Sequence, residues 1–184
     1  MKLFAKVFFA FALLISNAIA QTEVQTVTLY PPRDKVTGKY DESRACFDFK
    51  SGALKTGRYW TLGYGFMAIS NQDWFILQSS SQSRSVIKDL GELKWEDSFE
   101  IPALEPLPVL PAGERRSVVI DSSADTHKQW ASETRIHAKV AAGHIYLIRV
   151  KDDESDFYVL FRVEEFKRQE RCAISWKRIQ SPEK

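Results

Sequence analysis

The stretch HIYLIRV at residues 144–150 decides the fold, together with FYVLFRV at residues 157–163 and CAISW at residues 172–176. These stretches are rich in β-branched and aromatic residues, and their patterning follows the period of two that is typical of strands. The acidic turn 152–156 separates the first stretch from the second, and residues 167–170 lie between the second and the third. The pattern therefore predicts three successive antiparallel strands.

The first of these strands is apolar on both of its faces. Ile145 and Leu147 point one way, whereas Tyr146 and Ile148 point the other way. A strand that is apolar on both faces is covered on both sides. We therefore expect this strand to lie in the middle of a sheet.

The remainder of the chain continues the same pattern in shorter segments. Further strands are expected at residues 24–30, 44–50 and 84–90, with a hairpin that joins 58–69 to 74–78 and an extended segment around Leu93, Trp95 and Phe99. Helix is scarce: residues 126–140 are the best candidate, and 134–140 fit a strand equally well. The sequence therefore predicts an all-β fold, an antiparallel β-sandwich or a partly open barrel, with little helix.

The chain is long enough for one domain with a real core. It has 184 residues, of which 44% are apolar and 12% aromatic, and this composition excludes a disordered chain. Four prolines fall within residues 101–111, where they exclude a strand. The segment could separate two small domains, but we expect a Pro-rich loop over a single β domain at 21–184.

Residues 1–20 have the features of a signal peptide. Lys2 and Lys6 precede a short apolar run, and Ala18-Ile19-Ala20 supplies a small-x-small cleavage site. The apolar run is shorter than the ~20 residues that span a bilayer, so we expect no membrane span. The expected location is the periplasm or the extracellular medium. Lys2 and Lys6 also account for the whole formal charge of +2, so the neutral remainder has no field that attracts nucleic acid.

The chain contains only two cysteines, Cys46 and Cys172. In an exported protein such a pair predicts a disulfide. The bond would close a long loop and make the first and last strands neighbours. The alternative is two separate buried thiols.

Aromatic residues gather in the first hairpin. Tyr59, Trp60, Tyr64 and Trp74 are candidates for a flat surface that binds a protein or a glycan, although aromatic residues in a β-protein are first of all core residues. The stretch GYGFMA at residues 63–68 matches a dinucleotide fingerprint but lies in a strand-like context without the required helix. Its glycines are expected to mark a bulge or a close aromatic contact.

The sequence offers no convincing catalytic or metal motif. His127, His137 and His144 have spacings that match no common metal site, so we expect neither a cofactor nor a metal. We expect an exported, non-enzymatic binding protein or envelope component. The alternatives are a secreted hydrolase with a site near residues 121–137, and heme or metal capture by histidines.

Two segments of the second half carry a resemblance. They are VIKDLG at residues 86–91 and VAAGHIYLIR at residues 140–149, followed by Tyr158, Val163 and Trp176. The chain here resembles small β-domains of uncharacterised exported bacterial proteins, in which a D-L-G segment precedes a G-H-x-Y-x-x-R strand. The resemblance covers the last half of the chain. It implies a β fold and export, and it brings no activity or catalytic residue.

Overall fold

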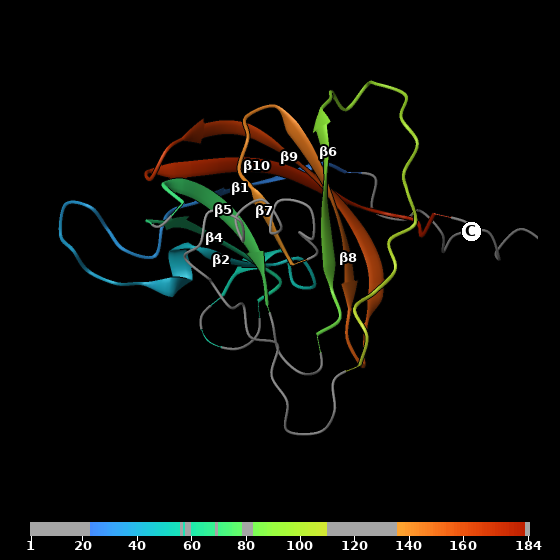
Figure 1. Cartoon of the computed structure of the whole chain (residues 1–184), viewed down its shortest axis with the longest axis horizontal. Helices are drawn as coiled ribbons and strands as arrows, with labels where there is room; N and C mark the ends of the chain where they lie inside the picture. The colour runs from blue at the N-terminus through green and yellow to red at the C-terminus, as the bar shows by residue number, and fades with distance from the viewer. Residues whose placement is uncertain are drawn as a thin grey trace, which may run out of the picture.

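The architecture consists of two five-stranded antiparallel sheets (Figure 1). It is seen in a computed structural model that describes residues 23–55, 57, 60–68, 70–78, 83–109 and 136–182. The arrangement is that of a β-sandwich, so the predicted all-β fold is confirmed. Within the described residues, the only helical element is the 3-10 turn η1 at Glu42–Arg44.

The first sheet contains the three strands that the sequence predicts most clearly. In spatial order it consists of β1 (Gln25–Leu29), β10 (Arg171–Ile179), β9 (Asp156–Lys167), β8 (His144–Lys151) and β6 (Val86–Glu92). Each neighbouring pair is antiparallel. The hairpin order of β8, β9 and β10 is therefore as expected.

The second sheet is built mainly from the first half of the chain. Its spatial order is β3 (Ala53–Leu54), β2 (Cys46–Asp48), β4 (Leu62–Met67), β5 (Gln72–Leu77) and β7 (His137–Lys139). The predicted hairpin is β4 and β5, paired from Leu62 with Leu77 to Met67 with Gln72. The segment that fits either helix or strand contributes β7 at the edge.

The main core lies between the two sheets. Tyr146 of β8 stacks on Phe161 of β9 with 4.9 Å between ring centroids, and Phe75 of the second sheet meets both rings edge-on. Ile145 and Leu147 of β8 belong to a separate apolar cluster on the other face of the first sheet. The two-sided burial predicted for β8 is therefore confirmed.

A coil segment covers the outer face of the first sheet. We call residues 93–107 the strap. Its apolar side chains Leu93, Trp95, Phe99, Ile101 and Leu104 pack on that face. The sequence predicts an extended segment here, but these residues form no strand, and Trp95 lies in a turn in which the Asp97 amide donates to the Lys94 carbonyl at 3.2 Å. The described part of the Pro-rich loop is coil.

The strap is also held by hydrogen bonds to the first sheet. Trp95 Nε1 donates to Ser175 Oγ at 2.9 Å, and Arg149 Nη1 donates to the Leu104 carbonyl at 2.8 Å. The Tyr158 hydroxyl lies 3.2 Å from the Leu104 amide nitrogen. Apolar packing and polar bonds therefore fix the strap along its length.

The predicted disulfide is wrong, because Cys46 and Cys172 are both free and buried. Cys172 points into the core between the sheets. Phe47 of β2 also points into that core, and the alternation of side chains along a strand sends Cys46 to the opposite, outer face of the second sheet. A bond between the two sulfur atoms would have to cross the second sheet. The first and last strands are neighbours nevertheless, through the antiparallel pairing of β1 with β10.

Candidate functional site

A hollow of about 690 Å³ lies on the outer face of the second sheet. Its described lining includes Pro32, Cys46, Trp60, Gly63, Gly65 and Ile76. A volume of this size falls in the range of ligand pockets. We call it the outer hollow.

The floor of the outer hollow is the glycine side of β4. Gly63 pairs with Cys46 of β2 on one side and with Ile76 of β5 on the other. A Cβ atom at Gly63 would lie 3.3 Å from Trp60 Cζ3, and one at Gly65 would meet only Pro32 Cδ at 4.0 Å. Gly63 therefore makes the close aromatic contact that the sequence predicts, and Gly65 leaves open space.

One wall of the outer hollow is the loop between β1 and β2, the blue excursion in Figure 1. Asp34 holds this loop together by accepting hydrogen bonds from the backbone amides of Val36 and Thr37 and from Arg44 Nη1. The Thr37 amide and the Arg44 guanidinium hold the pKa of the Asp34 carboxyl well below its usual range. The wall is therefore an internally bonded turn with an ionised carboxylate at its centre.

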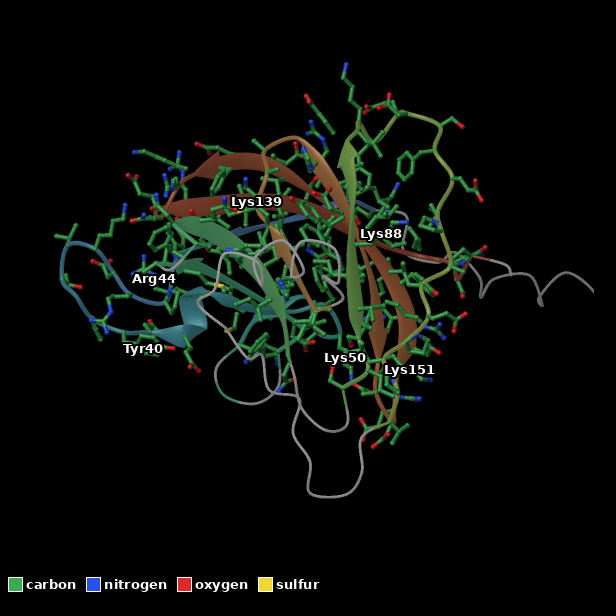
Figure 2. All side chains as sticks on the ribbon, in the orientation of Figure 1. Tyr40, Arg44, Lys50, Lys88, Lys139 and Lys151 are labelled. Atoms are coloured by element: carbon green, nitrogen blue, oxygen red, sulfur yellow. The ribbon has the colours of Figure 1, made fainter. Side chains whose placement is uncertain are left out.

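The wall closes on itself through a second set of contacts. Arg33 and Tyr40 form an isolated antiparallel bridge, and the Tyr40 hydroxyl donates to Glu42 at 2.9 Å. Figure 2 labels Tyr40 and Arg44 at the base of this loop. All three acidic side chains of the wall thus already have partners within it: Asp34 bonds Arg44, Asp41 bonds Ser43, and Glu42 bonds Tyr40.

The structure does not gather the four predicted aromatic residues on one surface. Trp60 lines the outer hollow. Tyr64 is 2% exposed and packs against Phe75 in the main core. Trp74 is buried on the opposite face of the sheet from Tyr64, and Tyr59 lies outside the described residues.

The only thiol that lines the outer hollow is chemically quiet. Burial raises the pKa of the Cys46 thiol to about 11, so it stays protonated at neutral pH. No histidine is present among the described lining residues. The described lining residues therefore include neither a thiolate nor an imidazole.

The described histidines lie in different sheets. His137 of β7 packs edge-on against Trp74 at 5.3 Å, and burial lowers its pKa. His144 of β8 pairs with Asp89 of β6 at 3.0 Å. His127 and residues 121–135 lie outside the described residues. Within the described part of the chain, no group of three His, Cys, Asp or Glu side chains could hold a metal ion.

The two motifs behind the sequence resemblance meet in space. Asp89 of the D-L-G segment pairs with His144 of the following motif, where the register of β6 and β8 shifts. Gly91 and Gly143 have positive φ angles of 91° and 78° at the same place. These residues build an irregular end of a strand pair, which accounts for them structurally.

Asp73 is a buried carboxylate that sequence reasoning places in a hairpin turn. It lies instead on β5, is 3% exposed, and accepts hydrogen bonds from the Tyr64 hydroxyl and the Gln169 amide. Burial and then this hydrogen bond raise the pKa of Tyr64, and burial followed by the charge of Asp73 raises that of Cys172. Asp73 thus ties the β4–β5 hairpin to the β9–β10 turn.

Comparison with models of protein families, with curated proteins and with solved structures finds no match to this chain. Among the described residues, no helix has the length and apolar character needed to cross a membrane.

Proposed function

We propose that the protein is an exported, non-enzymatic binding protein whose ligand enters the outer hollow. The observation that carries this proposal is the pair of glycines on the outward side of β4, which leaves a space of about 690 Å³ beside Trp60 and Ile76. An apolar floor beside a few polar groups is typical of ligand sites. The proposed export follows from the leader at residues 1–20.

The polar groups around the outer hollow support binding over catalysis. Asp34 is engaged by Arg44, Glu42 is engaged by Tyr40, and Cys46 stays protonated. General acid–base or nucleophilic catalysis needs a group that is poised to exchange a proton or to attack. None of the described lining residues is such a group.

The test is to fill the outer hollow and ask whether ligand binding disappears. Gly65→Leu places an aliphatic side chain in the space beneath Pro32. Ala53→Leu adds the same side chain at an exposed position of the edge strand β3 and is the matched control. A thermal-shift screen of lipids, peptides and glycans should yield a ligand that stabilises the parent protein and the control but leaves Gly65→Leu unchanged.

Two outcomes would overturn the proposal. A ligand that stabilises Gly65→Leu as much as the parent protein binds elsewhere. A screen in which no compound stabilises the parent protein, although the fold is intact by circular dichroism, would show that the outer hollow is not a ligand site.

A further inference from the structure

We propose, on the basis of the binding function above, that the ligand is an anionic amphiphile. Its apolar body would occupy the outer hollow, and its carboxylate or phosphate head would lie at Arg33 and Lys35 on the rim. The two halves of this proposal rest on different observations, namely the chemistry of the floor and the state of the charges on the wall.

The centre of the floor, at Gly63, offers an apolar surface without free backbone polar groups. There β4 is paired with β2 on one side and with β5 on the other, whereas Gly65 and Phe66 pair with β5 alone. The surrounding side chains of Trp60 and Ile76 are only half-buried. At this central part of the floor a glycan, whose hydroxyl groups need hydrogen-bonding partners, would find few, whereas an alkyl chain needs none.

The three acidic groups of the wall, Asp34, Asp41 and Glu42, already accept hydrogen bonds within it, and Asp34 is also paired with a cation. Asp34 is paired with Arg44 at 2.8 Å, and Glu42 accepts the hydrogen bond from Tyr40. The hydrogen bond and charge of Lys167, paired with Glu170 at 2.6 Å, lower the pKa of Glu170, and the charge of Lys35 lowers it further. Within the described residues, no carboxylate therefore makes a direct ion pair with Arg33 or Lys35.

The two cations of the rim are free to meet a ligand. The only hydrogen bond of the Arg33 side chain within the described residues is a long one, 3.5 Å, to the Gly38 carbonyl. Lys35 takes part in no ion pair among those residues, and both side chains line the outer hollow. Pro32 lies next to Gly65 and directly precedes Arg33 in the sequence. The two cations therefore lie just beyond the apolar space. An anion at this rim gains two charge interactions.

The experiment compares three probes that share one alkyl chain. Decanoate, decanol and decyltrimethylammonium are titrated below their micellar concentrations into the full-length protein, with Trp fluorescence and calorimetry as readouts. Decanoate should bind about tenfold more tightly than either of the other probes, as expected for two exposed charge interactions. This preference should shrink as salt is added.

Variants assign the preference to the rim. The double substitution Arg33→Gln with Lys35→Gln should lower decanoate affinity about tenfold and leave decanol unchanged. The control removes two exposed cations from the other side of the molecule, Lys88→Gln with Lys94→Gln, and should bind like the parent protein. Figure 2 shows Lys88 on β6, well away from Tyr40 and Arg44.

The outcomes separate this inference from the proposed function. Equal affinity for the three probes, abolished by Gly65→Leu, would leave the binding function in place and overturn the anionic class. If no probe binds, the amphiphile is overturned. In that case a glycan or peptide from the broader screen whose binding is lost in Gly65→Leu would still uphold the binding function.

Discussion

The outer faces of the two sheets differ in how the chain itself covers them. On the first sheet, Ile145, Leu147 and Leu160 make an apolar face, and the strap lies over it with Trp95 and Leu104. On the second sheet, Gly63 and Gly65 contribute no side chains to the outer face, and the loop between β1 and β2 lies beside the resulting space without filling it. Large aliphatic residues need a cover, because leaving them exposed costs free energy in water. Glycines create no such demand, so the space beside them can remain open for a ligand.

The comparison is sharpest for two tryptophans. Trp95→Ala removes the apolar cover, the hydrogen bond to Ser175 and the contact with the Lys177 ammonium, so it should lower the free energy of unfolding by about 2 kcal/mol. Trp60→Ala, on the side of the outer hollow, should cost less than half as much and should weaken ligand binding. Urea unfolding of the two variants measures the difference. Equal losses would mean that the outer hollow is as structural as the strap.

The strap can be loosened at a single hydroxyl. The Tyr158 hydroxyl accepts from the Leu104 amide at 3.2 Å and donates to the Leu104 carbonyl at 3.3 Å. Tyr158→Phe should therefore cost about 1 kcal/mol and speed hydrogen exchange at the strap. Tyr40→Phe is the control on the other face, because its hydroxyl bonds only Glu42 at an exposed position. A loss of stability in the control as large as in Tyr158→Phe would contradict the comparison.

Low pH should destabilise the side of the molecule on which the strap covers the first sheet. Arg149 clamps both Asp156, through two hydrogen bonds of 2.8 Å, and the strap carbonyl of Leu104. The hydrogen bond from Arg149 lowers the pKa of Asp156 from 3.8 to about 2, so the stability that this ionised pair adds is complete above about pH 4 and is lost as the pH falls toward about 2. Asp156→Asn should therefore flatten the loss of stability between these values. Urea midpoints measured across this pH range test it, and parallel curves for both proteins would contradict it.

A substitution at the floor of the outer hollow should raise the free energy of unfolding rather than lower it. A Cβ at Gly65 meets only Pro32 Cδ at 4.0 Å, and the backbone there is ordinary strand. Gly65→Ala should therefore stabilise the protein by about 0.5 kcal/mol because alanine restricts the unfolded chain. Gly91→Ala is the matched control, since it also has open space but has a φ of +91°, and it should destabilise. Destabilisation by Gly65→Ala would show that the space is tighter than described.

The smallest effect should come from reducing agents. Because Cys46 and Cys172 are free, reductant should leave the melting temperature unchanged, and both thiols should be alkylated in the denatured, unreduced protein. In the native protein Cys46, which is 7% exposed beside the outer hollow, should react before Cys172, which is fully buried between the sheets. An intact mass two hydrogens below that of the reduced chain, with no alkylation, would show that the two cysteines form a disulfide.

Much of the fold can be predicted because its strands carry their own pattern. The alternation in residues 144–150 predicts both the strand and its burial on two faces, and hairpin connections order β8, β9 and β10. The position of Cys46 shows the limit of this reasoning. Whether two cysteines can meet depends on which side of a sheet each one faces, and a single residue of register decides that.

The outer hollow is not predicted from the sequence, because the hollow is formed by small residues, whereas the prediction considered large aromatic ones. The sequence draws attention to Tyr64 and Trp74, which are both buried. It predicts that the glycines mark a bulge or a close aromatic contact, and only Gly63 makes such a contact. An available signal was that Gly63 and Gly65 alternate with Tyr64 and Phe66, which empties one face of a strand. Which loop would stand over that face depends on tertiary structure that no local pattern specifies.

The pairing of β1 with β10 has a consequence for how the protein reaches its native state. Gln25 lies opposite Trp176, so the first sheet gains its edge strand only after nearly the whole described chain has been made. Bringing such distant segments together costs loop entropy before any contact compensates for it, and folding rates fall accordingly. When the protein refolds from urea, the N-terminal strand β1 should therefore be the last strand to pair. A chain truncated before β10 should remain open and susceptible to proteases.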